Sequence, residues 1–314
     1  MKNPLVSLLV ANFNNGKYIA ETLQSAVNQT YQNIEIVIID DASTDNSVEI
    51  INDFLLRHCG LDPQSADKQG ILKRVQNDDI RIIFHKNKIN SGGCGNVKRQ
   101  CIELSNGDYF AFLDPEDTIT PDAVEQLMKT HLENSEKYSI VYCTHFLCNE
   151  KLEPQSVTTW AGKIPENQSH LTSTGGHISA FAMNRRADYE KTSGINPTYI
   201  VAEDMDLYLK MEEIAPVFFV NKPLYFYRKH DHNASWDYQK RYRNLFWRHA
   251  AEKAAYNRRK KQNTAAKNLT IKQLHSRNFS YFMQMAKFER TQKHFFKAII
   301  NNIKAIPYCY SILF

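Results

Sequence analysis

Short apolar runs of strand length alternate with helical patterns in the first part of the chain, and this alternation is the feature that most limits the fold. The runs PLVSLLVA at Pro4–Ala11 and IEIVII at Ile34–Ile39 are apolar at nearly every position, which suits strands covered on both faces of a sheet. Between them, Tyr18–Asn28 spaces its apolar residues as one face of a helix does. Strands that alternate with helices in this way predict an α/β fold with a mostly parallel sheet flanked by helices.

The same alternation continues to about residue 143, and residues 144–200 are mixed and rich in loops. Residues 58–79 interrupt it with polar residues, two glycines and a proline, so we expect a surface insertion without chemistry there. From about residue 237 the pattern is helical and basic. Further strands are expected at 80–85, 108–113, 139–143, 217–220 and 224–227, and further helices at 43–55, 96–104, from 121 onward and at 203–213.

Polar groups follow three of the predicted strands at the point where each strand ends. They are Asn12–Asn14, Asp40–Asp41 and Asp114–Asp117. Ligands of open α/β sheets bind beyond the carboxyl ends of the strands. Any one of these groups is equally well explained as a turn or a helix cap, but three at one edge of a sheet predict a ligand site.

The third group places three carboxylates, Asp114, Glu116 and Asp117, within four residues. Such hard oxygen ligands suit Mg²⁺ or Mn²⁺, and without a cation they would repel one another. The sequence has no Walker-type phosphate loop and no G-x-G-x-x-G after the first strand, which disfavours kinases, P-loop NTPases and dinucleotide dehydrogenases. Ser91–Gly93 is either a plain loop or a place where backbone N–H groups approach a ligand.

The chain resembles the inverting, bacterial-type glycosyltransferases of family 2, over about residues 4–230. Three segments stand in the family's order: VSLLVANFNN through IIDDASTD, a Gly-rich helix start, and GDYFAFLDPEDTITPDAV. The resemblance implies a GT-A type nucleotide-diphospho-sugar transferase fold. It also implies transfer of a sugar from a nucleotide-diphosphate donor to a hydroxyl of a glycan or lipid-linked acceptor, with Mn²⁺ or Mg²⁺ as cofactor.

The resemblance also implies which residues bind the donor nucleotide. The family often has Thr or Ser at the position of Ala11 and Tyr at the position of Phe13, so here a ring can stack on the base but a hydroxyl is missing. Lys98 stands where the family has a basic residue, usually Arg, and a cation there would pair with the diphosphate. The implied donor-binding residues are Ala11, Phe13, Asn14, Asp41, Gly93, Lys98, Asp114 and Pro115.

The metal ligands and the catalytic base are implied in the same way. The family's Asp-x-Asp-Asp motif falls on residues 114–117, so Asp114 and Glu116 are the expected metal ligands, with Glu116 where Asp is usual. His230, in a segment similar to the family's Tyr-Arg-x-His, is a further expected ligand. A Glu-Asp-x-Asp-Leu motif places Asp204 as the general base, with Glu203 beside it as an orienting residue; on the residues alone, carboxylates at a helix N-terminus are the alternative.

The charge of the chain is divided unevenly. Residues 240–314 carry 17 lysines and arginines against two acidic residues, whereas the rest of the chain is net negative. We therefore expect a catalytic domain at 1–235 and a basic helical region at 236–314. Basic helices with bulky apolar residues fit an anionic membrane surface, and a subdomain packed on the catalytic domain explains them equally well. No RNA-binding motif accompanies the charge, so no nucleic-acid partner is expected.

The compartment is suggested by the cysteines and by hydropathy. The six cysteines include no C-x-x-C pair, and no apolar stretch approaches the length that spans a bilayer. These features favour reduced thiols and a cytoplasmic protein, either free or peripheral on the inner face of the cell membrane in cell-envelope polysaccharide synthesis.

Three other hypotheses remain open at this stage. A nucleotidyltransferase would want a Gly- and Lys-rich loop after the first strand, and Asn12–Lys17 is a poor one. A phospho-acceptor signalling domain would leave Asp114–Asp117 and Glu203–Asp206 unexplained. A catalytically impaired GT-A binding protein is kept open by the departures from the family pattern, Glu116 among them.

Overall fold

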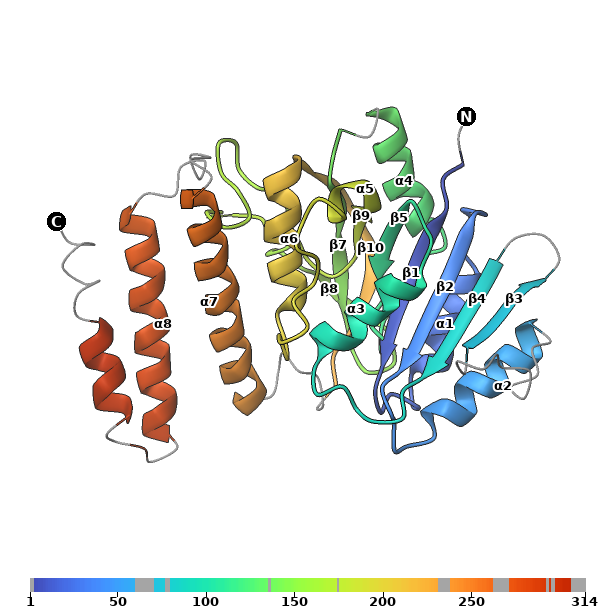
Figure 1. Cartoon of the computed structure of the whole chain (residues 1–314), viewed down its shortest axis with the longest axis horizontal. Coiled ribbons are helices and arrows are strands. Elements are labelled where there is room, and N and C mark those ends of the chain that lie inside the picture. The colour runs from blue at the N-terminus through green and yellow to red at the C-terminus, as the bar shows by residue number, and fades with distance from the viewer. Residues whose placement is uncertain are drawn as a thin grey trace. The chain divides into compact units, whose positions relative to one another are not determined.

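One ten-stranded sheet forms the centre of the N-terminal part of the chain (Figure 1). The computed structural model describes residues 3–59, 71–76, 80–134, 137–173, 175–230, 238–261, 271–291, 294 and 297–305. The strands are β1 (Val6–Asn12), β2 (Ile34–Asp40), β3 (Ile71–Gln76), β4 (Ile80–Lys86), β5 (Tyr109–Phe112), β6 (Thr118–Ile119), β7 (Ile140–Cys148), β8 (Pro154–Val157), β9 (Ala182–Arg185) and β10 (Val217–Arg228). The helices are α1 (Ile19–Val27), α2 (Ser47–Cys59), α3 (Cys94–Leu104), α4 (Ala123–Glu133), α5 (Arg186–Tyr189), α6 (Glu203–Ile214), α7 (Tyr238–Lys261) and α8 (Ile271–Thr291).

The sheet is mostly parallel, as the sequence predicts. Its order is β3-β4-β2-β1-β5-β9-β7-β10-β6, and β8 pairs with β7. Strands β4, β2, β1 and β5 are parallel neighbours, and β9 runs antiparallel to both β5 and β7. Since β10 is parallel to β7, the carboxyl ends of β1, β2, β4, β5, β7 and β10 all lie at one edge of the sheet.

The apolar runs at β1 and β2 are buried because helices cover both faces of the sheet. Leu8 and Ile36 face one core cluster, which includes residues of α1, α2 and α4. Leu9 and Val37 face the other, which includes residues of α3 and α6. Each such side chain stabilises the fold by about 1.5–3 kcal/mol, so an apolar residue at nearly every strand position is what a two-sided core requires.

Two sequence expectations differ from the structure. Part of the expected insertion, residues 71–76, forms strand β3 antiparallel to β4, because a backbone beside an unpaired sheet edge can satisfy its polar groups there; residues 60–70 and 77–79 lie outside the described part of the chain. The two short strands expected at 217–220 and 224–227 are one strand, β10. Its register shifts on both sides of Pro223, which has no N–H to donate to a neighbouring strand.

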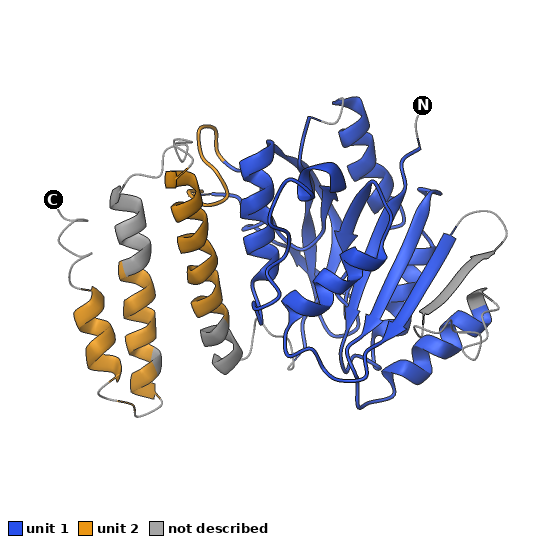
Figure 2. Ribbon diagram, in the orientation of Figure 1, with its two compact units in different colours: residues 1–164, 175–230 blue, residues 165–174, 231–314 orange. Residues whose placement is uncertain are grey.

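The chain divides into two compact units (Figure 2). The first comprises residues 1–164 and 175–230, and the second 165–174 and 231–314. In the second unit α7 packs with α8, and the buried Arg259 donates a hydrogen bond from Nη1 to Ser169 Oγ at 3.0 Å. The sequence did not indicate that 165–174 groups with the C-terminal helices, and the expected boundary at residue 235 lies outside the described residues.

Two further features of the described chain concern its helices and its cysteines. No helix there has the length and apolarity needed to cross a bilayer. The cysteines whose side chains are described are free thiols: Cys94, Cys101, Cys143 and Cys148.

Candidate functional site

The end of β1 and the loop that follows it carry the expected nucleotide residues: Ala11 lies in the strand, and Phe13 and Asn14 lie in the loop. Asn14 has a positive φ of 54° and joins this loop to the one after β2. Its N–H donates to Ser43 Oγ at 2.9 Å, and its side-chain oxygen accepts from the Thr44 N–H at 2.8 Å. The Asn14 side chain therefore holds the loop in shape, while Phe13 is 45% exposed and keeps ring surface available for stacking.

The acidic pair after β2 has two different structural roles. Buried Asp40 accepts hydrogen bonds from Asn12 Nδ2 at 2.7 Å and from Ser43 Oγ at 2.6 Å, which stabilises the turn. Asp41 accepts from Ser91 Oγ at 2.8 Å and from Asn87 Nδ2 at 2.7 Å. Asp41 thus ties the end of β2 to the loop after β4, and its role toward a nucleotide base stays a prediction.

The glycine-rich start of α3 allows two backbone segments to approach closely. A Cβ on Gly93 would lie 2.8 Å from Ile200 Cα, and one on Gly95 would lie 2.7 Å from the Tyr199 oxygen. The first N–H groups of the helix donate to this segment: Cys94 to Ile200 O at 3.1 Å and Gly95 to Tyr199 O at 3.0 Å. The glycines therefore place α3 against the segment that leads into α6.

Lys98 on α3 links the strand end that carries Asp114 to the helix that carries Glu203. Its Nζ lies 2.8 Å from Glu203 Oε1, 3.6 Å from Asp114 Oδ1 and 5.1 Å from the centre of the Phe112 ring. Burial disfavours the charged ammonium, but the carboxylates of Glu203 and Asp114 outweigh it and hold the pKa of Lys98 well above its usual value. Lys98 is thus a permanent, mostly buried cation in the middle of the acidic loops.

The N-terminus of α6 presents three acidic residues in different environments. Glu203 is buried, and burial raises its pKa while Lys98 opposes the rise. Asp206 is buried and its Oδ2 pairs with Lys210 at 2.6 Å, so it belongs to the interior of the helix packing. Asp204 is half-buried. The preceding Ala202 is in the left-handed region with φ of 62°, a conformation that costs a non-glycine residue about 1–2 kcal/mol.

The three carboxylates in the turn after β5, Asp114, Glu116 and Asp117, lie in different environments. Asp117 is buried and accepts hydrogen bonds from Tyr225 Oη and from the Arg228 N–H, both at 2.7 Å, so it anchors the turn to β10. Asp114 and Glu116 remain half-buried. Burial, and next the charge of Asp114, raises the pKa of Glu116 to about 7.

A divalent cation fits this donor set. The raised pKa of Glu116 shows that positive charge beside it would be favourable, and Mg²⁺ or Mn²⁺ typically uses one or two carboxylates together with substrate phosphates. The His230 ring is half-buried, with its centre 5.1 Å from that of Tyr18. Within the described ranges no cluster of three or more His, Cys, Asp or Glu is arranged to hold a metal, so an ion here would depend on donor phosphates as well.

The structure also identifies residues to which the sequence gave no role. Arg228 ends β10 and is almost fully buried, and its guanidinium contacts Tyr18 and the main chain of Glu116. One signal was present: a charged residue directly after the apolar run Leu224–Tyr227 and two residues before the expected ligand His230.

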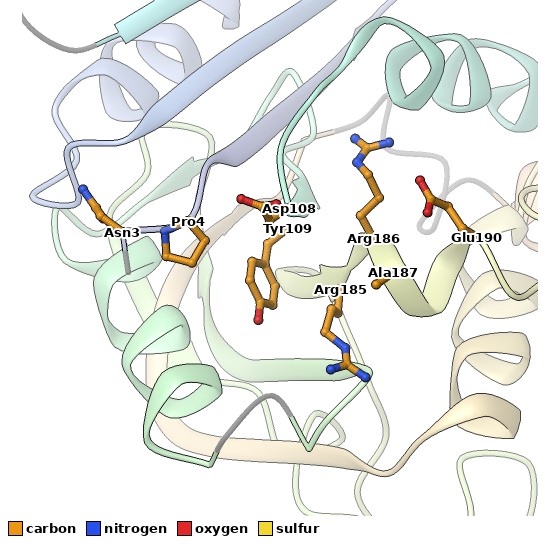
Figure 3. Close-up of a pocket in the computed structure, with 8 residues that line it drawn as sticks. All are labelled: Asn3, Pro4, Asp108, Tyr109, Arg185, Arg186, Ala187 and Glu190. Carbon is orange, nitrogen blue, oxygen red and sulfur yellow. The ribbon is translucent and has the colours of Figure 1, made fainter. Parts of the chain in front are cut away.

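A cavity of about 600 Å³ lies at the opposite edge of the sheet, where β1 and β5 begin (Figure 3). Arg185 there pairs with Asp188 at 2.6 Å, and Arg186 donates to Ser105 Oγ at 2.6 Å, so both guanidinium groups stabilise the fold. Ligands of parallel sheets bind at the carboxyl edge, which disfavours this cavity as the reaction site. Its lining residues are Asn3, Pro4, Asp108, Tyr109, Arg185, Arg186, Ala187 and Glu190.

A mostly parallel sheet with acidic loops at its carboxyl edge defines the class of GT-A type folds, and two solved structures agree. The Staphylococcus aureus TarS fragment 1–349 matches with a TM-score of 0.57 and 17% identity, over 98% of this chain and 91% of that one. The mannosyltransferase PcManGT from Pyrobaculum calidifontis matches with a TM-score of 0.57 and 13% identity, over 98% of this chain and 88% of that one. The fold predicted from the sequence is confirmed.

Sequence comparison then gives the family. The family model "Glycosyl transferase family 2" matches residues 7–192, and the chain belongs to this family. The chondroitin synthase of Escherichia coli is 30% identical over 233 residues, which are 74% of this chain and 30% of that protein. An uncharacterized glycosyltransferase of Haemophilus influenzae is 34% identical over 134 residues, 43% of this chain and 45% of that protein. The chain therefore spans less than half the length of these relatives.

Proposed function

We propose that this chain transfers a sugar, with inversion, from a nucleotide-diphosphate sugar to a hydroxyl of a glycan or lipid-linked acceptor. The observation that carries the proposal is the position of Lys98, which contacts both Asp114 at the end of β5 and Glu203 beside Asp204. One cation thereby joins the donor-side and acceptor-side carboxylates at the carboxyl edge of the sheet. Solved relatives in fold are described as complexes of TarS with UDP-GlcNAc and of a mannosyltransferase with GDP-Man and Mn²⁺, which supports a nucleotide-sugar donor.

In the proposed reaction Asp204 accepts the proton of the acceptor hydroxyl as its oxygen attacks the anomeric carbon. The bond from that carbon to the diphosphate oxygen breaks, and its electron pair leaves with the nucleotide diphosphate. Lys98 would share its charge with the departing group, and Glu203, whose Oε1 lies 2.8 Å from Lys98 Nζ, would orient it. Mn²⁺ or Mg²⁺ would be held by one or two of Asp114, Glu116 and His230 together with the donor phosphates, and it would supply further positive charge toward the diphosphate.

The nucleotide end of the donor is proposed to lie on the loops after β1 and β2. Phe13 offers ring surface for the base, and Ala11 lies at the same strand end without a hydroxyl. Asp41 would have to share its carboxylate oxygens between the base and Ser91. Gly93 and Pro115 would then border the donor through their backbone, because neither carries a polar side chain.

Calorimetric titration with UDP, GDP and TDP tests the donor site. We expect one of them to bind in the presence of Mn²⁺ or Mg²⁺ and to bind at least about tenfold more weakly with EDTA or in Glu116→Ala, because the diphosphate then loses the cation, or the cation loses one of its protein ligands. Glu133→Ala, on the exposed face of α4, is the control and should bind as the wild type does. Failure of all three nucleotides to bind with either metal would overturn the proposed function and favour a binding protein of the same fold.

We further propose that the basic C-terminal region binds the anionic inner face of the cell membrane. On the helical segment 297–305, Ile299, Ile300 and Ile303 are 54%, 49% and 59% exposed, and Lys297 and Lys304 are exposed beside them. Apolar side chains flanked by lysines are typical of helices that lie in an anionic membrane interface. This placement would bring the site to a lipid-linked or envelope acceptor.

Co-sedimentation with vesicles tests the membrane proposal. The protein should bind vesicles that contain phosphatidylglycerol and bind pure phosphatidylcholine much more weakly, with binding reduced by high salt. Replacing Ile299, Ile300 and Ile303 by Ser should weaken binding by tenfold or more, roughly, since about 0.8 kcal/mol is lost per buried CH₂. Ile89→Ser, at a residue 82% exposed in the other unit, is the matched control. Equal binding by the triple variant and the wild type would contradict the proposal.

A further inference from the structure

Arg228, the last residue of β10, is only 2% exposed, and its guanidinium connects three separate segments of the chain. Its Nε donates to the main-chain oxygen of Glu116 at 2.7 Å, in the turn after β5. Its Nη1 donates to the main-chain oxygen of Glu150 at 2.6 Å, in the loop after β7. Its Nη2 pairs with Glu21 Oε2 at 2.8 Å, on α1.

A ring contact extends this connection to His230. The guanidinium carbon lies 4.5 Å from the centre of the Tyr18 ring, and the centre of the His230 ring lies 5.1 Å from the same point. The Tyr18 hydroxyl donates to Glu150 Oε1 at 2.9 Å, which fixes the orientation of the ring. Arg228 therefore contacts the backbone of one expected metal ligand and, through Tyr18, the ring of the other.

Stability alone does not account for an arginine at this position. Burying a cation carries a desolvation cost of several kcal/mol, roughly, and a packed apolar side chain often stabilises such a site equally well. The arrangement uses what only arginine offers, a planar group whose donors diverge toward three acceptors while its face stacks on a ring. Lysine could keep the charge but could not reach all three acceptors in these directions.

We propose that Arg228 is a positioning residue of the donor-diphosphate site. It holds the Glu116 turn and the His230 ring in one fixed relation, so that both side chains address the same diphosphate-bound cation. The inference rests on the proposed function, since it concerns how that site is held. It predicts that replacing the Arg228 guanidinium weakens binding of the diphosphate part of the donor and leaves binding of the nucleoside part unchanged.

The test compares two ligands in the 314-residue chain, using whichever of UDP, GDP or TDP the wild type binds. In Arg228→Lys, binding of this diphosphate with Mn²⁺ should weaken about tenfold or more, since charge-assisted hydrogen bonds that orient the ligands are lost. Binding of the matching nucleoside monophosphate in EDTA should change less than about twofold, since it depends on contacts of the kind that Phe13 offers. Arg57→Lys, an exposed arginine paired with Asp53 on α2, is the matched control and should leave both affinities unchanged.

Tyr18→Leu provides a second variant that keeps all three hydrogen bonds of Arg228 but removes the ring between it and His230. It should also bind the diphosphate with Mn²⁺ more weakly while its affinity for the monophosphate is unchanged. If Arg228→Lys does not fold, Tyr18→Leu alone tests the inference. Equal losses for diphosphate and monophosphate, or no loss in a folded variant, would overturn the inference while the proposed function stood. If the wild type binds no nucleotide diphosphate, the proposed function fails and the inference fails with it.

Discussion

Asp204→Asn is expected to slow sugar transfer by about 10²–10⁴-fold and to leave binding of the donor nucleotide unchanged. The amide has nearly the shape of the carboxylate, but it cannot accept the proton of the acceptor hydroxyl. Asp204 is half-buried at the start of α6, so the substitution leaves the packing of the helix in place. The measurement is release of nucleotide diphosphate in the presence of acceptor, with calorimetry for the donor.

Asp206→Asn on the same helix is the matched control. Asp206 is buried against Lys210, so its replacement should lower stability more than it lowers transfer at saturating donor. The base assignment would be wrong if Asp204→Asn transferred sugar at the wild-type rate. It would also be wrong if Asp206→Asn, with an unchanged melting temperature, lost transfer to the same degree.

Lys98→Met is expected to reduce the free energy of unfolding by about 3–5 kcal/mol and to abolish most donor binding. The side chains of Lys98 and Glu203 are only 12% and 5% exposed, so removing the cation leaves a buried carboxylate without its partner. Donor binding falls because the same cation is proposed to face the diphosphate. Urea unfolding and calorimetry measure the two effects separately.

The double variant Lys98→Met with Glu203→Gln separates stability from function. It removes both buried charges, so it should regain much of the lost stability and still fail to bind the donor. The neighbouring Arg99→Met is the control, because Arg99 forms an exposed ion pair with Glu103 that is worth about 0–1 kcal/mol. A double variant that regained donor binding would show that Lys98 serves the fold alone.

The sequence predicted the elements that rest on local periodicity. Continuous apolar runs such as Ile34–Ile39 can be buried only in a sheet covered on both faces, and the polar residues after them then fall at one edge. The same argument placed Asp114 and Glu116 at the carboxyl edge of the sheet, and the family resemblance added Lys98 as a cation for the diphosphate. Family membership and fold were therefore within reach of the sequence.

The sequence could not predict which carboxylates of each acidic group stabilise the fold and which remain available to a ligand. Asp117 and Glu116 are neighbours in the chain, yet Asp117 is bound by Tyr225 from a strand more than a hundred residues away. Asp41 is likewise held by Ser91 across the sheet edge. Such pairings depend on tertiary contacts that no periodicity records, and they decide which carboxylates are left to meet a ligand.

The grouping of residues 165–174 with the C-terminal helices means that the polypeptide enters the helical unit twice, at residue 165 and again at residue 231, and returns to the first unit in between. The helices are therefore not a detachable appendage. A chain cut after His230 would keep Ser169 but lose Arg259, which donates a hydrogen bond to the Ser169 hydroxyl oxygen. The buried polar residues of that segment, His170 and Thr172 among them, would remain behind without the rest of their unit.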